Sequence, residues 1–129
     1  MSNPNRYGRP SPRRRIAPGE FGSGCGHVTC SYAELVRCFG QPTYVAPVHE
    51  RVKVAIQWKL EDHVTGNLFS VYEWKSTTRC STHPSALSLA KLRRLPEFRW
   101  SIGAGKFDLD ALRAWMSERL GREVKLEVG

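Results

Sequence analysis

Apolar and polar residues alternate along one stretch of the chain, between Arg51 and Lys75. In its first half the alternating apolar residues are Val52, Val54, Ile56, Trp58 and Leu60. A period of two is typical of a strand with one buried face, and a helix would not keep these side chains together. The second half, 68–75, is rich in aromatic and β-branched residues, and turn-forming residues separate the two halves. The pattern therefore predicts an antiparallel hairpin with a fairly long loop.

Helical periodicity is present on both sides of this hairpin. Ser31 and Glu34 have the spacing of a capping box, and Gly40 is suited to end the helix that they begin. A longer amphipathic helix is predicted between Asp108, as its N-terminal cap, and Gly121. Its apolar residues recur at intervals of three and four: Leu109, Leu112, Trp115, Met116 and Leu120.

Three shorter segments complete the pattern. The segment 86–95 is predicted as a short helix with Ser85 as its cap, although two of its leucines are also spaced as in a strand. Alternation at Phe98, Trp100 and Ile102 predicts a third strand. Residues 122–128 alternate apolar with charged side chains, which is typical of an edge strand whose charges discourage pairing with other molecules.

These elements predict an α+β fold, in which a small antiparallel sheet of the hairpin plus a third strand is covered by two or three short helices. A chain of 129 residues has room for one core, so we expect a single domain over residues 25–129. Residues 1–24 are rich in Pro, Gly, Ser and Arg, which predicts a flexible, disordered arm. No apolar run approaches the roughly 20 residues of a membrane span. We therefore expect a soluble, cytoplasmic protein.

The positive charge of this segment suggests a function for it. The formal net charge is +8, and half of it lies in residues 1–20, where five arginines oppose one glutamate. Arginines bind phosphates irrespective of base sequence, because each neutralised phosphate releases counterions. We expect nucleic-acid contacts from these side chains: Arg6, Arg9, Arg13, Arg14 and Arg15. A solubilising tail is the alternative interpretation.

The polar face of the predicted sheet is a second candidate for nucleic-acid binding. Arg51, Lys53 and Lys59 lie on the polar side of the first strand, and Arg99 joins them if the third strand pairs alongside. Either Tyr72 or Trp74 can stack bases if its ring points outward. The alternative is the ordinary wet face of a two-layer domain.

Cysteine and histidine residues form a candidate metal site. Cys25, Cys30, Cys80 and His83 supply the sulfur and imidazole ligands of a tetrahedral zinc ion, which would pin two loops. Loop residues without a metal are the alternative, and we expect no other cofactor. We expect no enzymatic activity and no catalytic residues, because neither a cysteine-nucleophile signature nor a phosphate-binding loop is present.

The order of Trp58, Gly66, Tyr72, Lys75 and the run 100–103 resembles a pattern in small accessory proteins of bacteriophages and large DNA viruses. In those proteins a hairpin ending in aromatic-x-x-Lys is followed by a Trp-x-Ile-Gly-Gly turn and a helix. The resemblance covers roughly residues 31–120, with Ala104 in place of the second glycine. It implies a viral or mobile-element accessory protein and brings no assigned activity.

The combined interpretation is a small non-enzymatic protein that binds DNA or RNA without sequence specificity, through its arm and basic sheet face. If it is viral, its location is the host cytoplasm. The alternative is a protein-interaction factor, such as a viral inhibitor of a host protein or a minor virion component. That factor would use an exposed aromatic patch or the edge strand 124–128.

Overall fold

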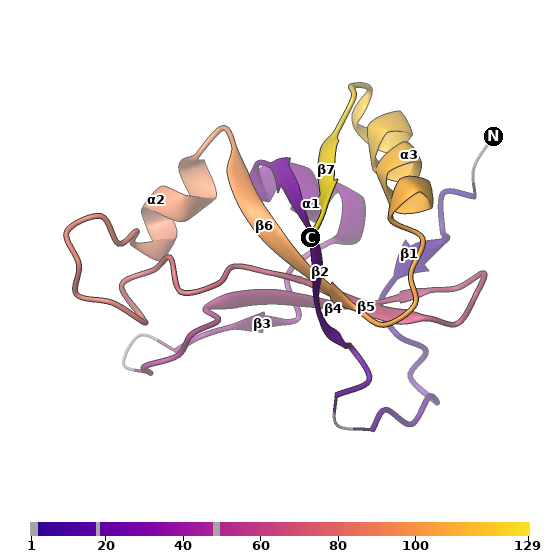
Figure 1. Cartoon of the computed structure of the whole chain (residues 1–129), viewed down its shortest axis with the longest axis horizontal. Helices are drawn as coiled ribbons and strands as arrows, with labels where there is room; N and C mark the ends of the chain where they lie inside the picture. Colours follow the sequence, from indigo (N-terminus) through magenta and orange to yellow (C-terminus); the bar gives the residue numbers. More distant parts are fainter. Residues whose placement is uncertain (1–2, 18, 48–49) are drawn as a thin grey trace.

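The computed structural model describes residues 3–17, 19–47 and 50–129. Within these residues the fold is α+β, a seven-stranded antiparallel sheet with three helices (Figure 1). The strands are β1 Tyr7–Gly8, β2 Ser23–Cys30, β3 Tyr44–Val45, β4 Ile56–Asp62, β5 Leu68–Tyr72, β6 Phe98–Ala104 and β7 Lys125–Val128. The helices are α1 Tyr32–Phe39, α2 Leu89–Arg94 and α3 Leu109–Leu120. The strand order is β1-β4-β5-β6-β2-β7, and β3 also pairs with β4.

The predicted hairpin is confirmed as β4 and β5, which are antiparallel with Trp58 opposite Val71. Its first strand begins at Ile56, four residues later than the alternation predicts. The reason is a tertiary contact, since the Ala55 amide donates to the buried carboxylate of Glu73. The alternating pattern continues through 52–55, but at Ala55 a side chain takes the place of a backbone acceptor on the neighbouring strand.

The third strand, β6, is confirmed, and it pairs with β5 on one side and β2 on the other. The sequence does not predict β2, because its glycines suggest a loop. One of them, Gly26, is required by close packing, since a Cβ there would lie 2.5 Å from the carbonyl oxygen of Glu127. A glycine-rich strand thus forms where a neighbouring backbone approaches closely.

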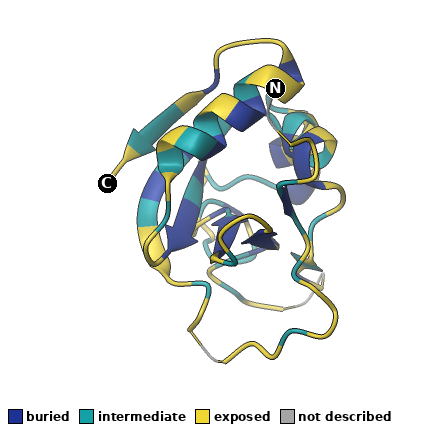
Figure 2. Ribbon diagram, turned by 90° about the vertical axis from the view of Figure 1, so that its right-hand side faces the viewer, coloured by how far each residue is buried: buried dark blue, intermediate teal, exposed yellow. Residues whose placement is uncertain are grey.

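The core lies between the sheet and helices α1 and α3. Trp58 and Trp100 are fully buried there, with ring centroids 5.5 Å apart in an edge-to-face arrangement. Each indole N–H donates to a backbone carbonyl, that of Gly40 for Trp58 and that of Cys30 for Trp100. Figure 2 shows α3 with buried residues toward the sheet and exposed residues outside. The paired N–H groups allow both tryptophans to be buried at little polar cost.

Helices α1 and α3 have the predicted caps. Ser31 and Glu34 form a complete capping box at α1, and Asp108 accepts from the Ala111 amide at α3. The short helix α2 is also confirmed, but it begins at Leu89 with Ser88 as its cap. The predicted cap, Ser85, is instead 2.7 Å from His83 Nδ1.

The N-terminal segment departs from the flexible arm that its composition predicts. Tyr7 is only 4% exposed, and its ring packs edge-on against Phe69 and Trp115. Tyr7 and Gly8 also form strand β1, in which Tyr7 lies opposite Asp62 of β4. One buried aromatic residue, which overall composition does not reveal, thus attaches the segment to the domain. Residues 9–17 and 19–22 then follow the side of the sheet opposite α1 and α3 (Figure 1).

The last strand, β7, is the edge strand that the sequence predicts, with β2 as its neighbour in the sheet order. It begins at Lys125 and leaves Val128 83% exposed. Within the described residues, no helix combines the length and the apolar character that a membrane span requires.

Candidate nucleic-acid interface

Two of the five N-terminal arginines are used inside the protein. Arg6 donates to both carboxylate oxygens of Asp62, at 3.1 and 3.0 Å. Arg14 donates through Nη1 to Glu61 and to the carbonyl oxygen of Gly66, each at 2.7 Å. Both carboxylates are buried, so these arginines neutralise charges that would otherwise destabilise the fold. Arg6 and Arg14 therefore hold the segment to the sheet and are not available to phosphates.

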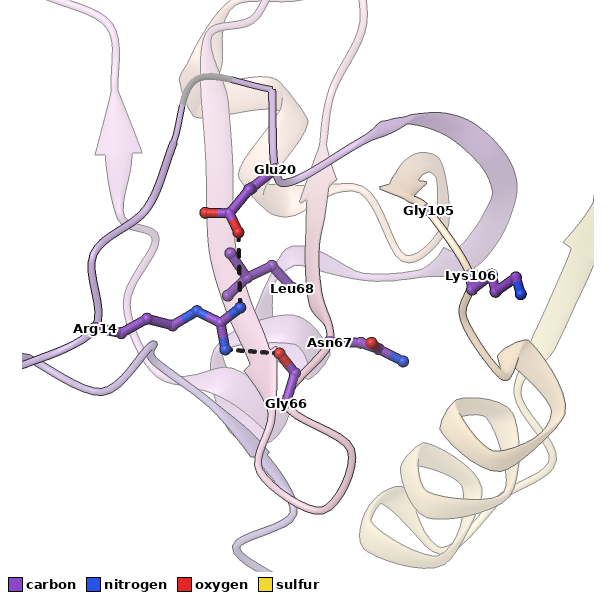
Figure 3. Close-up of a pocket in the computed structure, with 7 residues that line it drawn as sticks. All are labelled: Arg14, Glu20, Gly66, Asn67, Leu68, Gly105 and Lys106. Atoms are coloured by element: carbon purple, nitrogen blue, oxygen red, sulfur yellow. Dashed lines mark hydrogen bonds and ion pairs between the residues drawn. The ribbon is translucent and has the colours of Figure 1, made fainter.

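A hollow beside the hairpin turn contains Arg14 and is drawn in Figure 3. Its lining also includes Glu20, Asn67 and Lys106. In the figure the Arg14 guanidinium extends to Gly66, with Glu20 on its other side at 3.9 Å. Since its one central cation already has two anionic partners, the hollow is not a good anion site.

The other three N-terminal arginines, Arg9, Arg13 and Arg15, are exposed. None of them forms an ion pair with another residue of the described part of the chain. They lie on the segment that follows the sheet face opposite the helices (Figure 1). These three predicted phosphate-binding residues are thus positioned to meet an external anion.

The cations of the predicted sheet face divide into two groups. Lys59 is exposed on β4, with Nζ 5.7 Å from the ring centroid of Phe21, and Arg99 is exposed on β6. Arg99 Nε lies 3.9 Å from Glu127, which also has Lys125 at 3.7 Å. Arg99 therefore has an acidic neighbour, while Lys59 has none among residues 3–17, 19–47 and 50–129. The remaining two, Arg51 and Lys53, are not on the sheet at all.

Arg51 and Lys53 lie in the loop before β4, next to the chain that leaves β5. The Lys75 amide donates to the carbonyl oxygen of Lys53 at 2.7 Å, and the Val52 amide donates to that of Arg79 at 3.2 Å. These backbone contacts gather four basic residues, which we call the loop-end cluster: Arg51, Lys53, Lys75 and Arg79.

The loop-end cluster has no acidic partner in the part of the chain that the structure describes. Three of its members line one shallow hollow with Val52 and Cys80. Neither an ion pair nor a carboxylate hydrogen bond joins any of the four to another described residue. In addition, the Arg79 Nε is buried and has no hydrogen-bond partner among the described residues. Since unneutralised like charges repel one another, such a cluster favours binding of an anion.

Glu73 holds the two chains of the loop-end cluster together. Its side chain is fully buried and accepts hydrogen bonds from the backbone amides of Ala55 and Ser76. Burial raises the pKa of Glu73, although the two amide hydrogen bonds act in the opposite direction. Its role is therefore one of positioning, because it joins the loop before β4 to the turn after β5.

Two aromatic residues adjoin the cluster. Tyr72 is half-buried on the sheet face opposite the helices, between Gln57 of β4 and Ser101 of β6. Trp74 follows it and is exposed, with the two ring centroids 6.2 Å apart and the planes at 81°. Although the two rings are in contact, the indole is exposed to solvent, whereas Tyr72 packs against the sheet at Gly103.

The predicted zinc ligands do not come together. Among residues 3–17, 19–47 and 50–129, no three His, Cys, Asp or Glu side chains are placed to hold a metal ion. Cys30 is buried in the core, where burial raises its pKa to about 12, and burial also raises the pKa of Cys25. Cys80 lines the loop-end hollow, while His83 is exposed beside Ser85. The prediction treated 25–30 as a loop, but these residues belong to β2.

Sequence reasoning missed Lys75 and Arg79 as parts of the same cluster as Lys53. The hairpin contains a signal for Lys75, since pairing Gln57 with Tyr72 brings the chain before β4 close to the chain after β5. The position of Arg79 depends on its backbone contact with Val52, for which the sequence offers no sign.

No protein-family model matches the chain, and comparison with curated proteins finds no match. Function is therefore inferred from the residues themselves.

Proposed function

We propose that the protein is a non-enzymatic nucleic-acid-binding protein that contacts phosphates through the loop-end cluster. The observation that supports this most directly is the absence of any acidic partner for its four cations within the described residues. Arg9, Arg13 and Arg15 add exposed positive charge on another part of the surface. Exposed cations of this kind bind the phosphate backbone of DNA or RNA without reading the base sequence.

The experiment that tests this proposal is fluorescence anisotropy with labelled DNA and RNA over a series of salt concentrations. Each lost phosphate contact should lower the slope of log K against log salt concentration by about 0.7 on single strands. We expect the double variant Arg51→Ala/Lys53→Ala to bind more weakly and to lose about 1.4 from that slope. Both side chains are exposed, so the fold should be unchanged.

The matched control is Lys106→Ala/Arg113→Ala, which removes the same charge beside and within α3, at the other end of the molecule in Figure 1. We expect this control to keep most of the affinity and of the salt slope. Equal losses in the two double variants would mean that net charge alone attracts the nucleic acid, and the loop-end site would be rejected. Absence of binding by the unaltered chain at low salt would reject the function.

The exposed edge strand β7 favours a second candidate function, binding of a protein partner by strand addition. Val128 projects from this edge at 83% exposure. Main-chain hydrogen bonds at a sheet edge provide affinity for an extended peptide, and this affinity depends little on salt. A partner whose binding is insensitive to salt and is abolished by Leu126→Pro would support this function over the first one.

We also propose that the protein is an accessory protein of a bacteriophage or large DNA virus, which is what its resemblance to such proteins implies. Under this proposal, the bound nucleic acid is a viral genome or transcript in the host cytoplasm. Binding experiments with both DNA and RNA are the first test of which one is preferred.

A further inference from the structure

Trp74 differs from the other tryptophans of the chain. Trp58, Trp100 and Trp115 are buried in the core, and each donates its indole N–H to a backbone carbonyl. Trp74 is 48% exposed. Its ring is thus accessible to a ligand, which the rings of the three buried tryptophans are not.

The turn that carries Trp74 is fixed on both sides. Before it, Glu73 is buried and bonded to the Ala55 and Ser76 amides. After it, the Ser76 hydroxyl donates to the Trp74 carbonyl oxygen at 3.1 Å. Lys75 has a φ of 56°, in the left-handed region that residues with a Cβ seldom adopt. Because these contacts hold an unfavoured backbone conformation, the backbone that carries the indole is positioned before any ligand arrives.

A positive charge lies over the exposed ring, in a cation–π contact. Lys75 Nζ is 5.2 Å from the centroid of the Trp74 ring, and the Lys75 backbone is bonded to Lys53. Tyr72 meets the indole edge-on and supports it from the sheet side. An exposed aromatic surface therefore stands next to the cations of the loop-end cluster.

This combination matches a single-stranded nucleic acid. Every unpaired base has a flat face that can stack on an aromatic ring, and a negatively charged phosphate follows each base. In a duplex the bases are already stacked on one another, so their flat faces are not accessible to an aromatic ring. A protein partner would also cover the indole, but it would leave four cations without anions unless it were strongly acidic.

We infer that Trp74 is a stacking platform for an unpaired base, so that this end of the molecule prefers single-stranded nucleic acid to duplex. This inference rests on the proposed phosphate-binding function and adds the strand preference to it. The base lies against the indole, while Lys53 and Lys75 bind the phosphates on either side of it.

The experiment compares a 20-nucleotide poly-dT strand with a duplex of equal length, using the full chain. Loss of one base–aromatic stack should weaken single-strand binding by about 5-fold to 100-fold in Trp74→Ala. Duplex affinity and the salt slopes should be unchanged, because no charge is removed. Trp74→Phe should retain part of the preference. Val64→Ala, at another exposed apolar residue on the far side of the hairpin, is the matched control and should bind as the unaltered chain does.

The outcomes separate the two proposals. If Trp74→Ala lowers single-strand and duplex affinity equally, or changes neither, the stacking platform is rejected while phosphate binding stands. If the unaltered chain binds neither form at low salt, both proposals fail. A purified acidic protein that loses affinity in Trp74→Ala, with no effect of the substitution on poly-dT binding, would assign the platform to a protein partner. Thermal melting of each variant verifies that the fold is retained.

Discussion

Arg6 and Asp62 face each other in a two-point hydrogen-bonded pair that joins the N-terminal strand to β4. The Nε–Oδ1 distance is 3.1 Å and the Nη2–Oδ2 distance is 3.0 Å. The Asp62 side chain is 3% exposed, so its charge depends on this partner. Burial alone would raise the pKa of Asp62, but hydrogen bonds from Arg6, the Val64 amide and Thr65 outweigh it, and the pKa lies below its usual value.

Removing Arg6 should therefore destabilise the fold. In Arg6→Ala the buried carboxylate keeps its charge but loses its arginine, and we expect a loss of about 1–3 kcal/mol in the free energy of unfolding. Urea denaturation measures this difference. Arg9→Ala is the control, since Arg9 is exposed without a described partner, and its effect should stay within about 0.5 kcal/mol. Similar values for the two variants would mean that the pair contributes little.

The Glu34–Arg122 pair should make the protein sensitive to acid. Hydrogen bonds from Arg122 lower the pKa of Glu34 from 4.5 to about 2, against an opposing effect of burial. A lowered pKa stabilises the fold above the unfolded-state value, and this stabilisation is lost as the pH falls toward 2. The melting temperature of Glu34→Gln should be lower than that of the unaltered protein near pH 6, and the two should converge near pH 2.

Glutamine still completes the capping box, so this variant isolates the charge. Glu123→Gln, which replaces an exposed neighbour of Arg122, is the control and should follow the unaltered protein at every pH. A constant difference between Glu34→Gln and the unaltered protein down to pH 2 would contradict the assignment.

Glu73 should give the opposite pH dependence. Burial raises its pKa, so the folded protein holds a proton more tightly than the unfolded chain does. Its contribution to stability is then complete below the unfolded-state pKa and is lost as the pH rises through the folded-state value. The free energy of unfolding relative to Glu73→Gln should therefore decrease from pH 4 upward, as measured by urea denaturation at each pH.

Glu73→Ala should also affect binding. It leaves the Ala55 and Ser76 amides without their acceptor, which costs about 1–3 kcal/mol for each buried donor. Since the loop before β4 and the turn after β5 then keep only their backbone hydrogen bonds, we expect the loop-end cluster to be held less firmly and nucleic-acid affinity to fall, although no cation is removed. Unchanged affinity in a folded Glu73→Ala protein would show that Glu73 does not position the site.

Gly22 and Gly19 allow steric crowding to be separated from backbone strain. Both have left-handed φ values, 75° and 81°. A Cβ on Gly22 would lie 2.3 Å from the carbonyl carbon of Ala104, whereas no described residue beyond its chain neighbours comes within 4 Å of one on Gly19. Gly19→Ala should cost about 1 kcal/mol for its backbone, and Gly22→Ala should cost about 1–3 kcal/mol more. Equal unfolding free energies for the two variants would mean that the chain at Gly22 can move away from β6 and make room for the added Cβ.

The parts of the fold that the sequence predicts are those governed by neighbours along the chain. Alternation identifies β4, β5 and β6, and capping residues such as Ser31 and Asp108 identify helices. Strand β2 is not predicted because its glycines are required by contacts distant in sequence, such as the one between Gly26 and Glu127. The candidate site is likewise predicted where it depends on local sequence and missed where it depends on contacts distant in sequence. The exposed arginines of the N-terminal segment are visible in the sequence. The loop-end cluster instead depends on tertiary contacts, which are those of Glu73 and the backbone hydrogen bonds between the two chains.

The pairing of β1 and β3 with β4 has a consequence for self-association. Together these two short strands cover the outer edge of β4, β3 at Ile56 and Gln57 and β1 at Glu61 and Asp62. An uncovered edge is a template for pairing between molecules. Deleting the first eight residues would look like trimming a tail, yet it would uncover main-chain donors and acceptors of β4 and remove Arg6 from the buried carboxylate of Asp62. The N-terminal segment thus blocks pairing of β4 between molecules, and a shortened chain is expected to form oligomers through β4.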